Sequence, residues 1–325
     1  MAKYLVTGVA GFIGSSIGHE LVQRGETVRG LDDFSTGKRE NIAGIKNDLD
    51  FRQISLLDTP GLAAACQGID YVVHQAALPS VPKSVAEPEL THAVNVNGTL
   101  NLLIAARNAG VKRVVYAASS SAYGETEVLP KREDMLPRPI SPYAVQKLTG
   151  EYYMQTFSAV YGLETVSLRY FNIFGPRQDA NSQYSAVLAK FITQMQRGES
   201  PTIFGDGEQS RDFTYVANAV QANLKACVAP AKEVSGKVFN IATGSRYSLN
   251  QTFEMLRKII GFSGPARFSA PRTGDVKHSL ADIALAQKHL GYFPDVSFEE
   301  GLRRTVAWYE QLSAGARSHN LVAQE

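Results

Sequence analysis

The chain has 325 residues, and its 33 basic and 31 acidic side chains leave a formal net charge of only +2. This balance gives no basis for a nucleic-acid surface or a polybasic membrane anchor, and no segment is long and apolar enough to span a bilayer. Cys66 and Cys227 stand alone and the chain starts without a signal-peptide core, so we expect a cytoplasmic protein without disulfides that binds neither nucleic acid nor membrane.

Short apolar runs alternate with helical patterns through the first half of the chain. Strands are predicted at Lys3–Thr7, Thr27–Leu31, Phe51–Ile54, Tyr71–His74, Val114–Ala117 and Glu164–Arg169. The main helices between them are predicted at Val94–Ala109 and Pro142–Val160. Continuous apolar strands separated by helices are typical of a parallel sheet that is covered on both faces. The pattern therefore predicts an α/β fold with a doubly wound parallel (Rossmann) sheet.

The pattern changes after Gly175-Pro176, where the expected strands become short and scattered. Helices are predicted over 184–197, Val216–Cys227 and Leu249–Ile260. We expect one domain over residues 1–175, which carries the large sheet, and a smaller mixed α/β domain over 176–325. The boundary is expected to be discontinuous, because Val238–Ile241 can return to the large sheet and parts of 210–245 then join the first domain. The polar tail after about Ala314 is expected to fray.

A glycine-rich segment, Gly8-Val9-Ala10-Gly11-Phe12-Ile13-Gly14, links the first strand to the first helix. Glycines there allow a tight turn and the close approach of a pyrophosphate, and the start of the helix offers free N–H groups. The glycine spacing differs by one residue from the common dinucleotide fingerprint. Asp32 follows the second strand, where a carboxylate can bind both hydroxyls of an adenosine ribose and repel a 2′-phosphate. NAD is therefore favoured over NADP, and the alternative is a solvated aspartate in a turn.

A tyrosine and a lysine share one face of a predicted helix. Ser141 is expected to cap this helix and Pro142 to occupy its first position. Tyr143 and Lys147 are four residues apart. A neighbouring ammonium and an oxidised nicotinamide would lower the pKa of the phenol from its usual value of about 10. The phenolate could then remove a proton from a sugar hydroxyl while hydride leaves the same carbon.

Three serines, Ser119 to Ser121, follow the fifth strand at the sheet edge where doubly wound folds bind their ligands. A hydroxyl in this place could donate to and accept from the reacting oxygen. The alternative is a serine-rich loop that only caps the strand.

These motifs together resemble those of the extended short-chain dehydrogenase/reductases. They are Gly8-x-x-Gly11-x-x-Gly14, Asp32, Ser119–Ser121 before Tyr123-Gly124, Tyr143-x-x-x-Lys147 and Tyr170-Phe171-Asn172. Within that family the chain is most similar to UDP-sugar 4-epimerases, especially those acting on UDP-N-acetylglucosamine and UDP-N-acetylgalactosamine. The likeness runs from about residue 3 to residue 310.

The resemblance implies an NAD-dependent epimerisation at C4 of the sugar. Tyr143 would be the base, Ser119 would flank the 4-hydroxyl, and Lys147 would bind the nicotinamide ribose. Hydride would leave C4 and return to its other face, so NAD is expected to stay bound. The implied cofactor contacts are Gly8, Gly11, Phe12, Ile13, Gly14, Asp32, Ser35, Thr36, Gly37, Leu56, Gln75, Ala76, Ala77, Asn95, Tyr143, Lys147 and Tyr170. Ser55 stands where the family usually has an aspartate near the adenine, which would weaken cofactor binding.

The substrate half of the site is also implied by resemblance. Asn172, Arg211 and Arg272 are expected to bind the diphosphate of the substrate, and Asp275 the uridine ribose. Ser80, Ser120, Ser121 and Ser279 complete the implied substrate contacts. The family position of Ser279 closes the pocket beside C2 of the sugar. A small residue there admits an N-acetyl group, so the N-acetylated pair is predicted, without excluding UDP-glucose and UDP-galactose.

Other activities stay open. Related dehydratases and decarboxylases carry an acidic residue in the loop that here contains Ser119 to Ser121, but a UDP-glucuronate 4-epimerase or another NAD-dependent enzyme of nucleotide sugars remains an alternative. A nonenzymatic NAD-sensing regulator, a different class, would typically lose Tyr143 or Lys147. No His or Cys cluster has metal-ligand spacing, so no metal is predicted. The helices Val94–Ala109 and Pro142–Val160 resemble those that form a four-helix bundle across a homodimer.

Overall fold

The structure, a computed structural model, describes residues 1–180, 187–271 and 277–322. Its centre is a seven-stranded parallel sheet with the strand order β11-β6-β5-β4-β1-β2-β3. The strands are β1 (Lys3–Thr7), β2 (Thr27–Asp32), β3 (Leu49–Gln53), β4 (Tyr71–His74), β5 (Arg113–Ser119), β6 (Glu164–Tyr170) and β11 (Lys237–Ile241). The predicted α/β doubly wound fold is confirmed, and each predicted strand lies within two residues of its observed bounds.

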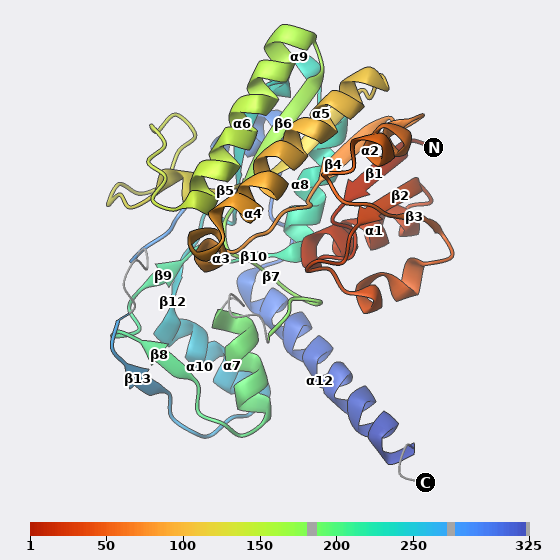
Figure 1. Ribbon diagram of the computed structural model, residues 1–325. Helices are drawn as coiled ribbons and strands as arrows, with labels where there is room; N and C mark the ends of the chain where they lie inside the picture. The colour runs from red at the N-terminus through yellow and green to blue at the C-terminus, as the bar shows by residue number, and fades with distance from the viewer. Residues whose placement is uncertain (181–186, 272–276, 323–325) are drawn as a thin grey trace.

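Helices cover both faces of this sheet (Figure 1). One face packs against α2 (Thr59–Cys66), α5 (Gly98–Asn108) and α6 (Pro142–Tyr161), and the other against α1 (Phe12–Gln23), α8 (Val216–Val228) and α11 (Ala284–Leu290). Successive residues of a strand point to opposite faces of the sheet. Leu5 therefore belongs to the apolar core under α2, α5 and α6, and Val6 to the core under α1, α8 and α11. Both faces are therefore apolar, which is why the strands read as continuous apolar runs.

Helix α6 begins where the sequence predicts. The Ser141 hydroxyl accepts a hydrogen bond of 3.2 Å from the amide of Ala144, and Pro142 follows as the first helical residue. The helix lies very close to β5, because a Cβ atom at Gly150 would fall only 2.3 Å from the hydroxyl oxygen of Tyr116. This contact fixes the height of α6 over the sheet.

The strand β11 returns to the large sheet after a long excursion. Lys237 to Ile241 pair in register with Val166 to Tyr170 of β6, as the sequence suggested. Between these strands the chain forms much of a third apolar core, which α7 (Val187–Gln196), α10 (Leu249–Ile260) and α12 (Phe298–Val322) share. The division into domains 1–175 and 176–325 stays a prediction.

The remaining elements are short. They are η1 (Arg39–Ile45), α3 (Val81–Ala86), α4 (Pro88–His92), η2 (Ala93–Asn97), η3 (Ser120–Tyr123) and α9 (Ala231–Val234), with the strands β7 (Ile173–Phe174), β8 (Thr202–Phe204), β9 (Ser210–Arg211), β10 (Thr214–Tyr215), β12 (Tyr247–Ser248) and β13 (Arg267–Ser269). Two expectations are corrected. The helix predicted over Val94–Ala109 begins as the π-helical turn η2, and the tail predicted to fray after Ala314 continues as α12 to Val322. No helix in the described ranges has the length and apolarity needed to cross a membrane.

A buried ion pair joins α6 to the sheet. Two oxygens of Glu151 accept hydrogen bonds from Nε and Nη2 of Arg169 on β6, at 2.9 and 2.7 Å. Both side chains are almost fully buried, at 1 % and 4 % exposure. Loss of one partner would therefore leave a buried charge without compensation.

We expect Glu151→Gln to lower the free energy of unfolding by about 3–5 kcal/mol, because Arg169 then stays buried and unpaired. The matched control is Glu299→Gln, which breaks an ion pair with Arg303 whose two side chains are more than half exposed. This control should cost less than about 1 kcal/mol. Urea denaturation of the three proteins makes the comparison, and equal losses for the two variants would contradict the assignment.

Candidate active site

The glycine loop folds tightly against the carboxyl ends of β1 and β4. Gly8 has a φ of +68°, and a Cβ atom there would lie 2.8 Å from the backbone of Ala76. A Cβ atom at Gly14 would lie 2.0 Å from the carbonyl oxygen of Gly8. No side chain caps the start of α1, which follows Gly11. The first turn of α1 therefore offers its N–H groups and positive dipole end to an anion.

Asp32 lies at the end of β2 beside this loop and is almost fully buried. Its carboxylate accepts hydrogen bonds of 2.9 Å from the amide of Ala10 and 2.8 Å from that of Phe34. Burial raises the pKa of Asp32, and these two bonds act in the opposite direction. The carboxylate is thus oriented by the backbone, which argues against a merely solvated turn residue.

A cavity of about 560 Å³ runs from the glycine loop and Asp32 to the start of α6. Its lining includes most of the predicted cofactor contacts: Gly8, Gly11, Phe12, Ile13, Gly14, Asp32, Ser35, Thr36, Leu56, Gln75, Ala76, Ala77, Tyr143, Lys147 and Tyr170. A helix start free of side-chain caps for a diphosphate and an oriented carboxylate for a ribose match the chemistry of NAD. The residues present therefore fit this cofactor.

Two predicted cofactor contacts do not line the cavity. Asn95 is buried behind the cavity in the π-helical turn. Its side-chain oxygen accepts a hydrogen bond of 2.8 Å from the amide of Leu78. Its side-chain nitrogen donates to the carbonyl oxygen of Leu78 at 3.2 Å and to the side chain of Gln146. Gly37 lies against the outer side of Asp32, since a Cβ atom there would be 2.7 Å from a carboxylate oxygen. In this structure Asn95 holds a wall of the cavity, and Gly37 leaves room for the carboxylate.

Tyr170 lines the cavity within a polar network. Its hydroxyl accepts hydrogen bonds from the amide groups of Asn223 at 2.7 Å and Gln75 at 3.0 Å. Gln75 also donates to the side chain of Asn223. Burial raises the pKa of Tyr170 to about 12, so this hydroxyl stays neutral and keeps Gln75 in a fixed orientation.

Tyr143 and Lys147 point into the same end of the cavity from α6. Burial raises the pKa of Tyr143 to about 12, and a hydrogen bond with Ser119 opposes this rise. The Lys147 ammonium donates to the carbonyl oxygen of Ala117 at 2.9 Å. Burial lowers the pKa of Lys147 to about 8, while the nearby carboxylate of Glu151 acts to raise it. The expectation that an ammonium and an oxidised nicotinamide together lower the pKa of Tyr143 stays a prediction, and among the protein's own groups burial raises this pKa.

The serines after β5 form a small hydroxyl cluster. The amide and the hydroxyl of Ser121 both donate to the Ser119 hydroxyl oxygen, at 3.2 and 2.8 Å. Ser119 also acts on Tyr143, whose pKa it lowers, and their role as a catalytic pair stays a prediction. Ser120 begins the short helix η3. Ser80 lines the cavity and caps α3 by accepting the amide of Lys83 at 2.9 Å.

Three of the predicted substrate residues lie close together on the other side of β7. Asn172, whose φ is +38°, donates to the hydroxyl oxygen of Ser279 at 3.2 Å and to the backbone carbonyl of Asp212 at 3.0 Å. The amide of Ser279 donates to the carbonyl of Ser210, the neighbour of Arg211. Arg272 and Asp275 lie outside the described residues. The structure thus brings Asn172, Arg211 and Ser279 together.

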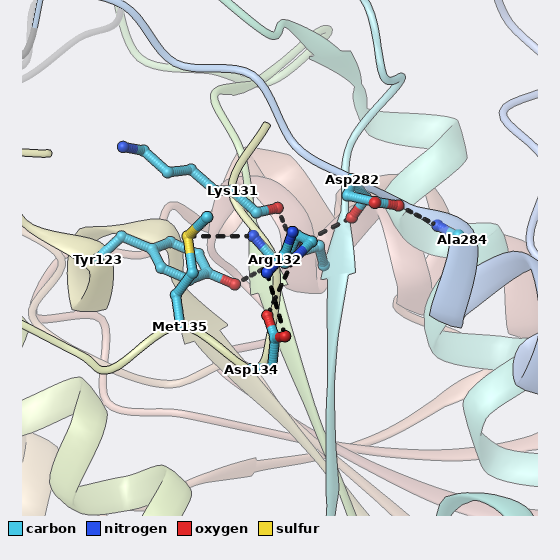
Figure 2. Close-up of polar contacts among 8 residues, drawn as sticks. Tyr123, Lys131, Arg132, Asp134, Met135, Asp282 and Ala284 are labelled. Atoms are coloured by element: carbon cyan, nitrogen blue, oxygen red, sulfur yellow. Dashed lines mark hydrogen bonds and ion pairs between the residues drawn. The ribbon is translucent and has the colours of Figure 1, made fainter. Parts of the chain in front are cut away.

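The segment that carries Ser279 is anchored to the loop after β5, as Figure 2 shows for Lys131 and Asp282. The amide of Asp282 donates to the carbonyl of Lys131 at 2.9 Å, and the amide of Lys131 donates to the carbonyl of Leu280 at 2.7 Å. The Tyr123 hydroxyl, which Figure 2 also shows, donates at 2.6 Å to the side-chain oxygen of Asn240. The side-chain nitrogen of Asn240 in turn donates to the carbonyl oxygens of Lys131 and Asp282. The position of Ser279 therefore depends on the same strand end that carries Ser119.

Sequence reasoning missed part of the cavity wall. Lys38, Asn41, Arg177, Gln178 and Asp179 line it as well, from the loops that follow β2 and β7. The positive charge of Arg177 beside Gly175-Pro176 is the available signal, although that dipeptide by itself indicates only a domain boundary.

Comparison with known proteins agrees with this geometry. Residues 4–242 match the model of the "NAD dependent epimerase/dehydratase family". The UDP-glucose 4-epimerase of Thermotoga maritima, solved with UDP-glucose, is similar with 39 % identity and a TM-score of 0.90 over 95 % of this chain and 99 % of that one. The UDP-N-acetylglucosamine 4-epimerase of Methanobrevibacter ruminantium M1, solved with UDP-N-acetylmuramic acid, is similar with 41 % identity and a TM-score of 0.91 over 96 % and 99 %.

The UDP-glucuronate 4-epimerase of Thermodesulfobacterium geofontis is 35 % identical over 96 % of this chain and 97 % of its own length. Relatives of this identity and coverage, together with a family model that spans most of the chain, agree with the cavity in which the glycine loop, Asp32, Tyr143 and Lys147 meet. This chain is an NAD-dependent enzyme and belongs to the NAD dependent epimerase/dehydratase family.

Proposed function

We propose that this protein interconverts UDP-N-acetylglucosamine and UDP-N-acetylgalactosamine by transient oxidation at C4 of the sugar. The observation that carries the 4-epimerase chemistry is the shared position of Tyr143 and Lys147 in the lining of the cofactor cavity, with Ser119 near enough to Tyr143 to lower its pKa. When bound, NAD supplies a reversible hydride acceptor and a positive charge at this point. One hydride and one proton leave the sugar and return to it, and the 4-keto sugar has to turn in the pocket so that the hydride reaches its other face.

Tyr143 is the proposed base. Ser119 orients the 4-hydroxyl of the sugar and relays its proton to the Tyr143 oxygen, and the same proton returns when the sugar is reduced. Burial alone holds the pKa of Tyr143 near 12, so the phenolate needs a positive charge close by. Lys147 is proposed to keep its ammonium near the nicotinamide ribose, where the carbonyl oxygen of Ala117 fixes its direction.

Ser279 supports the choice of an N-acetylated sugar. Its side chain is small and bonds Asn172, the proposed ligand of the substrate diphosphate, so it lies beside the expected place of the sugar. The likeness to a UDP-N-acetylglucosamine 4-epimerase agrees with this choice. UDP-glucose and UDP-glucuronate remain second candidates, because relatives of similar identity are named for them. A purely NAD-sensing regulator would not require both Tyr143 and Lys147 in the lining of the cavity.

We also propose a homodimer in which α5 and α6 pair with their copies. Val145, Tyr152 and Val160 are exposed apolar residues at helical spacing on α6, and Ile104 is exposed on the neighbouring α5. An apolar stripe of this kind on two adjacent helices is suited to a four-helix bundle.

The first experiment is an NMR assay of the purified protein with UDP-N-acetylglucosamine and no added NAD. We expect UDP-N-acetylgalactosamine to appear, because hydride returns to the sugar in each turnover and bound NAD is not consumed. Conversion of UDP-glucose or UDP-glucuronate alone, in parallel samples, would instead move the proposal to that substrate.

Tyr143→Phe is expected to lower kcat by about 10²- to 10⁴-fold, because the proton acceptor is lost. Tyr152→Phe, which changes an exposed tyrosine of the same helix, is the control and should leave kcat unchanged. Steady-state kinetics on proteins of equal NAD content provide the measurement. Full activity of the Tyr143 variant would remove this residue from the mechanism.

Ser279→Tyr is expected to reduce turnover of UDP-N-acetylglucosamine at least tenfold relative to UDP-glucose, because a large side chain would fill the place of the N-acetyl group. Ser279→Ala also loses the bond to Asn172 but stays small, and it should keep the preference of the unmodified protein. The ratio of kcat/KM for the two substrates is measured. An unchanged ratio in the tyrosine variant would refute the proposed role of Ser279.

A further inference from the structure

The loop after β7 forms a second wall of the cofactor cavity. Arg177, Gln178 and Asp179 line this cavity together with the glycine loop. The loop is held from two directions: the Tyr309 hydroxyl donates to the carbonyl of Gln178, and the carboxylate of Asp179 pairs with Lys38 at 3.0 Å. It is therefore an anchored part of the cavity and places its side chains reproducibly.

Arg177 adopts a backbone conformation that favours glycine. Its φ is +70°, in the left-handed region that residues with a Cβ atom disfavour. Glycines occupy the comparable turns elsewhere, such as Gly8 and Gly162. An arginine in such a place indicates that the side chain itself is needed, since strained residues persist mainly at functional sites.

The guanidinium of Arg177 lies beside α1, and no carboxylate of the described residues forms an ion pair with it. Its Nη1 atom donates to the hydroxyl of Ser16 at 3.4 Å, and burial lowers its pKa. Tyr215 is the only acidic group that acts on it within the described ranges, and a tyrosine is neutral at physiological pH. A half-buried cation with no carboxylate partner is suited to an anionic ligand.

We propose that Arg177 binds the diphosphate of NAD across from the start of α1. Ser16 is one helical turn beyond Phe12, so the guanidinium lies along the same face of α1 as the free N–H groups that face the cavity. Asp32 at the end of β2 is placed for the ribose, which leaves the diphosphate as the nearest anion. This inference rests on NAD binding and is independent of which sugar is epimerised.

The diphosphate of the substrate is the other possible source of this anion, and the geometry favours the cofactor. Asn172 and Ser279, the proposed ligands on the substrate side, bond each other and the 210–212 segment. Arg177 instead bonds α1, and the cavity that it lines holds the glycine loop.

The decisive variant is Arg177→Gly, because glycine accepts a φ of +70° and removes the guanidinium without adding strain. We expect the variant to keep its Tm and to release bound NAD about 10- to 100-fold faster, measured by repeated ultrafiltration of the purified holoenzyme without substrate. Arg177→Lys keeps the positive charge but loses the planar guanidinium. Its rate of NAD release should lie between those of the unmodified protein and Arg177→Gly. If the unmodified protein is purified without NAD, calorimetric titration with NAD gives the same comparison as a ratio of Kd values.

The matched control is Arg197→Gly, which removes an exposed arginine from the neighbouring groove and should leave NAD release unchanged. Affinity for UDP, titrated into the same proteins, separates the two diphosphates. Unchanged UDP affinity with faster NAD release supports the proposal. Unchanged NAD release in Arg177→Gly, or a tenfold loss of UDP affinity with NAD retained, would overturn it. Because no turnover is measured, neither result depends on the proposed epimerase activity.

Discussion

The arrangement of the site depends on the close contact between the glycine loop and the first turn of α1. A single added carbon at Gly14 would meet the carbonyl oxygen of Gly8 at 2.0 Å, so no other residue lets the helix start so near the sheet. This closeness turns the free end of α1 towards the cavity and brings Ala10 within reach of Asp32. The places expected for the diphosphate and the ribose of NAD both depend on this one contact.

The second constraint is electrostatic. Tyr143 and Lys147 are both buried, and burial disfavours the charged form of each: it raises the pKa of the tyrosine to about 12 and lowers that of the lysine to about 8. Without a further positive charge Tyr143 therefore stays protonated. In the proposed mechanism, the charge that bound NAD would supply favours the phenolate, so removal of the sugar proton would require the hydride acceptor to be present. The carboxylate of Glu151 one turn further along α6 acts in favour of the Lys147 ammonium.

The fold was largely predictable because its signals are local. Apolar runs identified the strands, and Ser141-Pro142 identified the start of α6. Asn95 and Gly37 show the limit of this reasoning. Motif resemblance selects residues near a ligand, but it does not separate a contact from a support behind it, as the bonds from Asn95 to Leu78 illustrate. The charge of Arg177 beside Gly175-Pro176 is visible in the sequence, but only the folded chain shows its positive φ and the helix that its side chain contacts.

The late return of β11 to the sheet has a consequence for biosynthesis. Strand β6 has β5 on one side, and its other edge is completed only by Lys237–Ile241, almost seventy residues after β6 ends. On the ribosome the growing sheet therefore presents the bare backbone edge of Val166–Tyr170 until the intervening segment has been made. A fragment that stops near residue 175 would keep this edge permanently. Completion of the nucleotide-binding sheet thus waits for the segment that contains α7 and Arg211, so part of the substrate side is always made before the sheet is closed.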